Sequence, residues 1–127
     1  MQSRPYQIQA DPRRHLVTIT FDTVFWGLDV VERFGVECRK CVASLDCEPG
    51  QHLILVDLRN AVLQGQEVYG RLQALIGSAT ARRIALVAST PLARMQTKRL
   101  QVRDNIIMFA DIGDAQAWLF DEAREAA

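Results

Sequence analysis

The sequence predicts an α/β fold with one mixed sheet of five strands and about four helices packed around it. Four short apolar runs recur at even intervals: LVTITF, LILVDL, RIALVAS and NIIMFAD. The segments between them have helical periodicity. Strands of a largely parallel sheet are apolar on both faces because crossover helices cover them, so apolar runs that alternate with amphipathic helices indicate this architecture.

A β-hairpin is expected at the start of the chain. Residues Tyr6 to Ala10 alternate apolar and polar side chains, as in a half-buried strand. The following DPRR segment is typical of a turn, and His15 to Phe21 is expected to return antiparallel as the second strand.

A helix and a third strand are expected next. The apolar periodicity is helical from Leu28 to Leu45, and Asp22 and Thr23 are expected to supply N-cap oxygens before it. Glu-Pro-Gly at residues 48–50 ends the helix. The apolar run from His52 to Leu58 then predicts the third strand.

The second half of the chain repeats the helix and strand pattern. Thr90-Pro91 is a good helix start, because threonine can accept free amide hydrogens and proline has none to lose. This third helix is the least apolar, with only Leu92, Met95 and Val102 expected to be buried. Asp111 to Asp114 has the spacing of a capping box before the last helix. The expected elements are helices at Gln66–Ala79, Thr90–Val102 and from Asp111 onward, and strands at Ile84–Ser89 and Ile106–Ala110, giving the order ββαβαβαβα.

Composition favours a single domain spanning residues 1–127 in the cytoplasm. The formal net charge is zero, which gives no electrostatic argument for nucleic acid and permits a homodimer. No apolar stretch approaches the length of a signal peptide or a transmembrane helix. Cys38, Cys41 and Cys47 are too crowded for a disulfide framework and are expected to be reduced core residues rather than metal ligands, so no metal and no cofactor are predicted.

An enzymatic alternative rests on polar residues at strand ends. Asp57, Ser89 or Thr90, and Asp111 each follow a predicted parallel strand, where open α/β sheets place ligands. Such a cluster could hold magnesium and a phosphoryl group. Receiver domains and aspartate-based phosphatases require further acidic or lysine positions that this chain lacks. Caps at Thr90 and Asp111, with Asp57 in a turn, are therefore the favoured interpretation.

A basic region is expected on the third helix. Arg94 with Lys98, and Arg99 with Arg103, have the spacing of neighbours on one helical face. This face could bind an anion, although contact with Asp121, Glu122 or Glu125 across a packing or dimer interface is favoured. Without interleaved aromatic residues it is a poor nucleic-acid surface.

The element order, with LILVDLRN, RRIALVAS, a helix containing MQTKRL, and IIMFADIGDAQAWL, resembles the SpoIIAA-like proteins of the STAS and CRAL-TRIO-related superfamily. The resemblance covers essentially the whole chain, and its most specific part is the final block. It implies a compact domain with a mixed five-stranded sheet.

Two functional branches follow from the resemblance. In anti-sigma-factor antagonists, a serine in an Asp-x-Ser pattern after the third strand is phosphorylated and switches binding. Here Arg59 takes the place of that serine within Asp57-Leu58-Arg59-Asn60, and no serine or threonine occurs between Asp57 and Ser78. In the lipid-transfer branch, mobile helices cover an apolar ligand, and the third helix would suit such a lid.

The resulting expectation is a non-enzymatic interaction or regulatory module without a phosphate switch. A carrier or sensor of a small apolar or anionic lipid-like ligand is the alternative, and a magnesium-dependent enzyme using Asp57 is the third candidate. The expected interaction or ligand surface comprises Asp57, Arg59, Asn60, Leu63, Gln64, Thr90, Arg94, Lys98 and Arg99.

Overall fold

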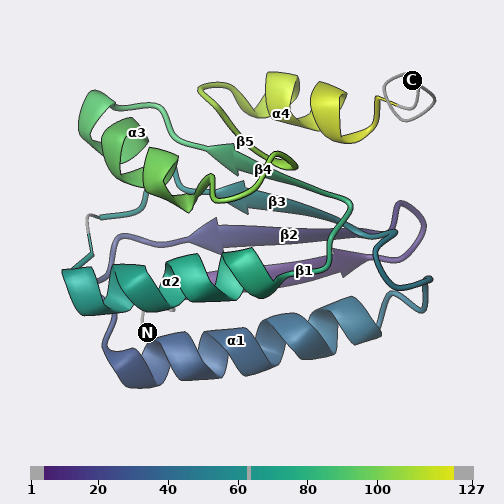
Figure 1. The fold of residues 1–127 in the computed structure, drawn as a ribbon, viewed down its shortest axis with the longest axis horizontal. Helices are drawn as coiled ribbons and strands as arrows, with labels where there is room; N and C mark the ends of the chain where they lie inside the picture. Colours follow the sequence, from purple (N-terminus) through teal and green to yellow (C-terminus); the bar gives the residue numbers. More distant parts are fainter. Residues whose placement is uncertain (1–4, 63, 122–127) are drawn as a thin grey trace.

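The five strands form one mixed sheet in the order β1-β2-β3-β4-β5 (Figure 1). The computed structural model describes residues 5–62 and 64–121. Strand β1 pairs antiparallel with β2, and the other three pairings are parallel. The elements are β1 (Tyr6–Asp11), β2 (Leu16–Phe21), α1 (Leu28–Ala43), β3 (Leu53–Asp57), α2 (Gln66–Ser78), β4 (Arg83–Val87), α3 (Pro91–Thr97), a 3-10 turn (Lys98–Leu100), β5 (Ile106–Phe109) and α4 (Ile112–Leu119). The predicted order of elements and the fold class are confirmed.

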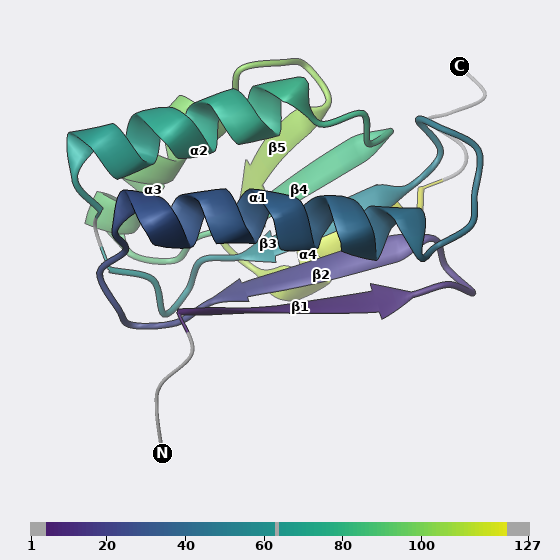
Figure 2. The same ribbon diagram turned by 90° about the horizontal axis from the view of Figure 1, so that it is seen from below.

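Helices cover both faces of the sheet, and this explains the continuous apolar strands. Helices α1 and α2 pack on one face and α4 on the other (Figures 1 and 2). Alternate residues of a strand point to opposite faces. Accordingly, Ile54 and Val56 of β3 join the core beneath α1 and α2, whereas Leu53 and Leu55 join the core beneath α4.

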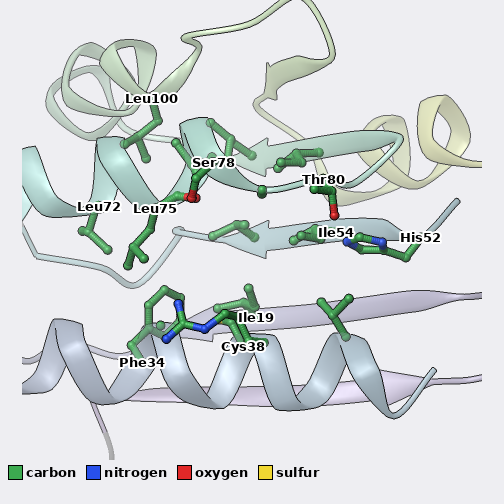
Figure 3. A pocket seen from close by; sticks show the side chains of 18 of the residues that line it. Ile19, Phe34, Cys38, His52, Ile54, Leu72, Leu75, Ser78, Thr80 and Leu100 are labelled. Atoms are coloured by element: carbon green, nitrogen blue, oxygen red, sulfur yellow. The ribbon is translucent and has the colours of Figure 1, made fainter. Parts of the chain in front are cut away.

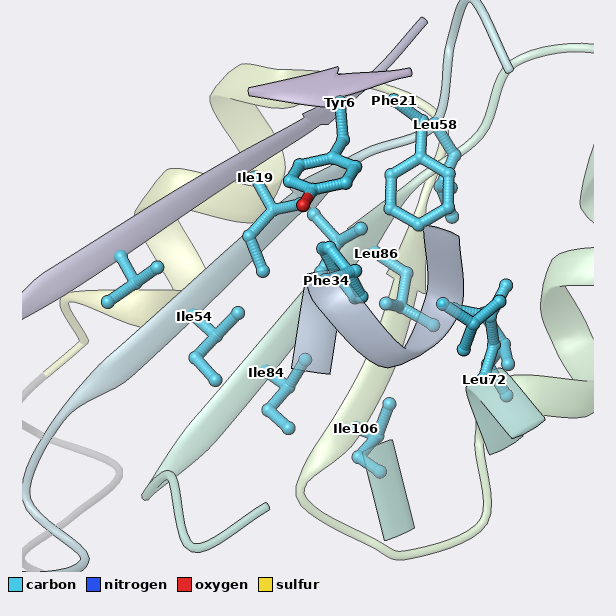
Figure 4. Close-up of a cluster of buried hydrophobic side chains, with 14 of the residues drawn as sticks. Tyr6, Ile19, Phe21, Phe34, Ile54, Leu58, Leu72, Ile84, Leu86 and Ile106 are labelled. Carbon is cyan, nitrogen blue, oxygen red and sulfur yellow. The ribbon is translucent and has the colours of Figure 1, made fainter. Parts of the chain in front are cut away.

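An aromatic cluster fixes the first helix against the hairpin. The rings of Phe21 and Trp26 stack with centroids 4.6 Å apart, and Tyr6 and Phe34 meet edge to face at 4.9 Å. Figure 4 shows Tyr6, Phe21 and Phe34 together above the sheet. Contacts of this kind add specificity to the burial of large apolar area.

The expected cap of the first helix is wrong. Helix α1 starts at Leu28 after Gly27, with no side-chain cap. The Asp22 carboxylate instead accepts a hydrogen bond from the Thr23 amide, and the Thr23 hydroxyl donates to the carbonyl of Asn60 at 2.7 Å. Several residues separate Asp22 and Thr23 from the first helical turn, so they do not cap the helix. Their hydrogen bonds link two loops instead.

The third helix also differs from expectation. It ends at Thr97 and continues as the 3-10 turn, so it does not reach Val102. Leu92 and Met95, expected in the core, are 63% and 65% exposed, and Val102 is exposed as well. Thr97 and Leu100 are the residues that this segment buries.

The caps and cysteines agree better with the sequence. The Thr90 hydroxyl accepts from the Ala93 amide, and the Asp111 carboxylate accepts from the Asp114 amide. The three cysteines are free and half-buried against the core, as expected for small apolar residues.

Within residues 5–62 and 64–121, no helix is both long and apolar enough to span a bilayer.

Candidate functional site

The carboxyl ends of the parallel strands gather most of the residues singled out in the sequence. Asp57 ends β3, and Arg59 folds back onto it. The Arg59 Nε atom donates to Asp57 Oδ1 at 2.9 Å, and Nη2 donates to Oδ2 at 2.8 Å. The Arg59 amide also donates to Oδ1 at 3.1 Å.

This bidentate pair determines the chemistry of Asp57. The hydrogen bond from the Arg59 side chain lowers the pKa of Asp57, against the opposing effect of burial. Both carboxylate oxygens are therefore engaged within the chain, which leaves Asp57 poorly placed as a phosphoryl acceptor or magnesium ligand. In the part of the chain that the structure describes, no group of three or more His, Cys, Asp or Glu side chains could hold a metal.

Gln64 was expected on the surface but is buried. Its Oε1 atom accepts from the Trp26 amide at 2.9 Å, and its Nε2 atom donates to the carbonyl of Val24 at 3.1 Å. Its own backbone exchanges two hydrogen bonds with the side-chain amide of Gln96 on α3, each 3.3 Å long. Gln64 therefore positions neighbouring segments, and Gln96 is the partner that the sequence analysis did not single out.

The loop that Gln64 holds presents an apolar side chain to solvent. Phe25 lies between the two residues bound by Gln64 and is 74% exposed. Leu92 and Met95 are exposed on α3 at the same end of the sheet, where Figure 1 places the loops after β2 and β3. The scarcity of buried positions in the third helix was a sequence signal for Leu92 and Met95; nothing in the pattern distinguished Phe25.

The remaining predicted site residues do not form one continuous basic surface. Asn60 is exposed beside the loop, and Leu63 lies outside the described residues. The Arg94 guanidinium donates to the carbonyl of Ala88 at 3.1 Å, which ties it to the end of β4. Lys98 and Arg99 are exposed on the 3-10 turn, so the expected basic pairs do not share one continuous α-helical face. Of the acidic residues expected to meet them, Glu122 and Glu125 lie outside the described residues.

The space beneath α3 does not suit a lid over a ligand. It amounts to about 20 Å³, which is room for about one water molecule. A cavity of about 310 Å³ lies elsewhere, between the sheet and helices α1 and α2 (Figure 3). This volume is within the range of small-molecule sites.

Apolar side chains make up most of the wall of this cavity. Strands β2, β3 and β4 form the floor, and α1 and α2 form the two sides. Figure 3 shows Leu72 and Leu100 at one end and His52 and Thr80 at the other. The residues of the floor are Ile19, Phe21, Ile54, Val56, Ile84 and Leu86, and those of the sides are chiefly Phe34, Cys38, Val42, Leu72, Leu75 and Ile76. None of the predicted site residues that the structure describes lines it.

Comparison with known proteins supports the fold. No family model matches the sequence, and no curated protein matches it. An uncharacterised protein of the DUF3478 family with a SpoIIAA-like fold, from Shewanella loihica PV-4, superposes with a TM-score of 0.68 and 14% identity, covering 94% of this chain and 98% of that one. An anti-sigma factor antagonist from Mycobacterium paratuberculosis gives a TM-score of 0.64 at 14% identity, covering 94% and 100%.

At this identity the similarity concerns architecture rather than activity. Both matches extend over nearly the whole length of each chain, so the correspondence includes the hairpin, the parallel strands and the helices on both faces. The chain has a SpoIIAA-like fold.

Proposed function

We propose that this chain is a protein-interaction module that binds its partner through the carboxyl-terminal edge of the sheet. The observation that carries the proposal is the exposure of Phe25, Leu92 and Met95 on segments that are joined through hydrogen bonds of the buried Gln64. Large apolar side chains held in fixed positions on a surface are typical anchors of protein interfaces. The structural similarity to an anti-sigma factor antagonist supports a protein as the partner.

Binding by this edge would not depend on phosphorylation at the third strand. Arg59 stands where the related antagonists place serine, and its guanidinium is engaged by Asp57. Position 59 therefore carries a permanent positive charge and no phosphate that could be added or removed. The same pairing makes a non-enzymatic role the better proposal for Asp57.

Site-specific photo-crosslinking tests the interaction. A photoreactive phenylalanine analogue is introduced at Phe25 or Leu92 in the source cells, and at Val36 as the control on the outer side of α1. We expect one discrete crosslinked protein from the first two positions, and its loss when Gln64→Ala is added. Identical crosslinks from Val36, or none from Phe25 and Leu92, would contradict this interface.

A second function, binding of a small apolar molecule, is favoured by the cavity between α1 and α2. Its volume of about 310 Å³ corresponds to roughly ten water-sized atoms. Displacement of water from apolar walls into bulk solvent is favourable. In this form the carrier or sensor proposal uses a different site from the basic third helix. Native mass spectrometry of gently purified protein would detect a bound molecule as an added mass that is lost on denaturation.

A further inference from the structure

The cavity between α1 and α2 has one polar end, and that end contains a buried histidine. The His52 side chain is 3% exposed and lines the cavity. Its backbone carbonyl accepts from the Arg82 amide at 2.8 Å, which fixes the residue at the entry to β3. The imidazole makes no hydrogen bond to any other residue that the structure describes.

The ring nitrogens of His52 are not sealed in the core, since neither is among the fully buried side-chain atoms without a partner in the described part of the chain. The imidazole can therefore offer a free donor and a free acceptor to a molecule in the cavity. The Thr80 side chain lies beside His52 at the same end (Figure 3). The Thr80 hydroxyl likewise makes no hydrogen bond within the described part of the chain. The imidazole, with one donor and one acceptor, and the exposed hydroxyl of Thr80 therefore lie at one end of a largely apolar space.

The charge of this end favours an uncharged head group. Burial lowers the pKa of His52, so its imidazole is neutral at pH 7. No aspartate or glutamate belongs to the described cavity wall. Arg39 also lines the cavity, but its Nη1 atom lies within 3.6 Å of a Cβ position on Gly35, one turn back along α1. A carboxylate beside His52 would lose hydration and would meet a neutral imidazole rather than a cationic one.

A route into the cavity lies between the two helices. A surface groove of about 210 Å³ shares Gly35, Arg39, Leu75 and Ser78 with the cavity wall. At Gly35 an added Cβ would stand 3.1 Å from the Leu75 side chain, so the glycine permits the close approach of α2. Leu75 thus separates the groove from the cavity with a rotatable side chain rather than with backbone.

We propose that this cavity binds an uncharged amphiphile of about ten non-hydrogen atoms, with its apolar body against Leu72 and Leu100 and a single hydroxyl or carbonyl group hydrogen-bonded to His52 and Thr80. The proposal rests on the second function above and names its ligand class and orientation. It requires no contact with the carboxyl-terminal edge.

Isothermal titration calorimetry of the full chain with 1-octanol and with octanoate at pH 7.5 tests the proposal. We expect one octanol per chain and at least about fivefold weaker binding of octanoate. His52→Phe removes both imidazole nitrogens, and Thr80→Val removes one hydroxyl at an exposed position; each should weaken octanol binding about fivefold. If His52→Phe does not fold, Thr80→Val alone provides the same test.

Two variants on α1 separate the cavity from the helix surface. Cys38→Phe places a ring inside the cavity and should abolish octanol binding, whereas Val36→Phe adds the same ring outside it and should leave binding unchanged. Cys38→Leu is the smaller filler and should weaken binding. Circular dichroism confirms that each variant is folded.

The outcomes distinguish the two levels of the proposal. Failure of both probes to bind the folded chain would overturn the carrier function and the ligand class together. Octanol binding that is lost in Cys38→Phe but unchanged in His52→Phe and Thr80→Val would retain the carrier function and overturn the assigned head-group site. Tighter binding of octanoate than of octanol would overturn the uncharged head group.

Discussion

The Asp57 carboxylate matches the sequence pattern of a ligand-binding residue, but its two oxygens bind a side chain of the same molecule. It stands at a strand end where ligands of α/β proteins commonly bind. Arg59, two positions later, contacts both of its oxygens. The short spacing makes this pair local, and it therefore forms without help from distant elements.

The ion pair predicts a pH-dependent contribution to stability. Asp57 has a lowered pKa in the folded state, so its contribution is present above the unfolded-state pKa and is lost as the pH falls through the folded-state pKa. Asp57→Asn should reduce the free energy of unfolding by about 1–3 kcal/mol at pH 7. Urea denaturation of both proteins should show this difference shrinking toward pH 3. Asp104→Asn, which changes an exposed carboxylate, is the control; a difference that does not change with pH would contradict the role of the pair.

The Cys38 thiol gives a second prediction for a single residue. Burial raises its pKa to about 12, so almost no thiolate is present at pH 8. In a Cys41→Ser, Cys47→Ser background, iodoacetamide should modify Cys38 at least about tenfold faster in urea than in the folded protein. Mass spectrometry of timed samples measures both rates. Equal rates would show that Cys38 is accessible and that its environment does not suppress ionisation.

At the scale of elements, one buried glutamine joins three segments at the carboxyl-terminal edge. Gln64 links the loop after β2 with its side chain and α3 with its backbone. Gln96 completes the contact from α3. These hydrogen bonds fix a loop conformation, because any rearrangement leaves several polar groups unpaired.

This junction predicts a local loss of protection when Gln64 is removed. Gln64→Ala leaves the Trp26 amide without its acceptor and should destabilise the fold by about 1–3 kcal/mol. Hydrogen exchange at Trp26 should accelerate more than exchange in the strands. Gln73→Ala removes a side-chain contact of α2 to the carbonyl of Arg99 and is the control. Unchanged exchange at Trp26 would mean that Gln64 does not hold the loop.

For the whole molecule, the sheet and its helices could be predicted because their signals are local and repeated. The apolar runs of β3 and β4 are continuous since both faces of each strand are covered, and the Thr90 and Asp111 caps depend on residues three positions away. The site could be predicted only in part. Gln64 and Gln96 meet across 32 positions, and side chains of α1, α2 and three strands that are distant in the sequence enclose the cavity. No local periodicity encodes either arrangement.

The open cavity lowers the free energy of unfolding, because the side chains of its walls lack contacts on one side. Filling a cavity commonly stabilises a protein, because the new side chain gains contacts that the walls lacked. Cys38→Leu should therefore raise the free energy of unfolding by about 0.5–1 kcal/mol in the absence of ligand, measured by urea denaturation. Cys41→Leu, on the same helix but outside the described cavity wall, should bring no such gain. Destabilisation by Cys38→Leu with no change from Cys41→Leu would show that the space between α1 and α2 is already closed in solution, because the two added methyl groups would then overpack the site.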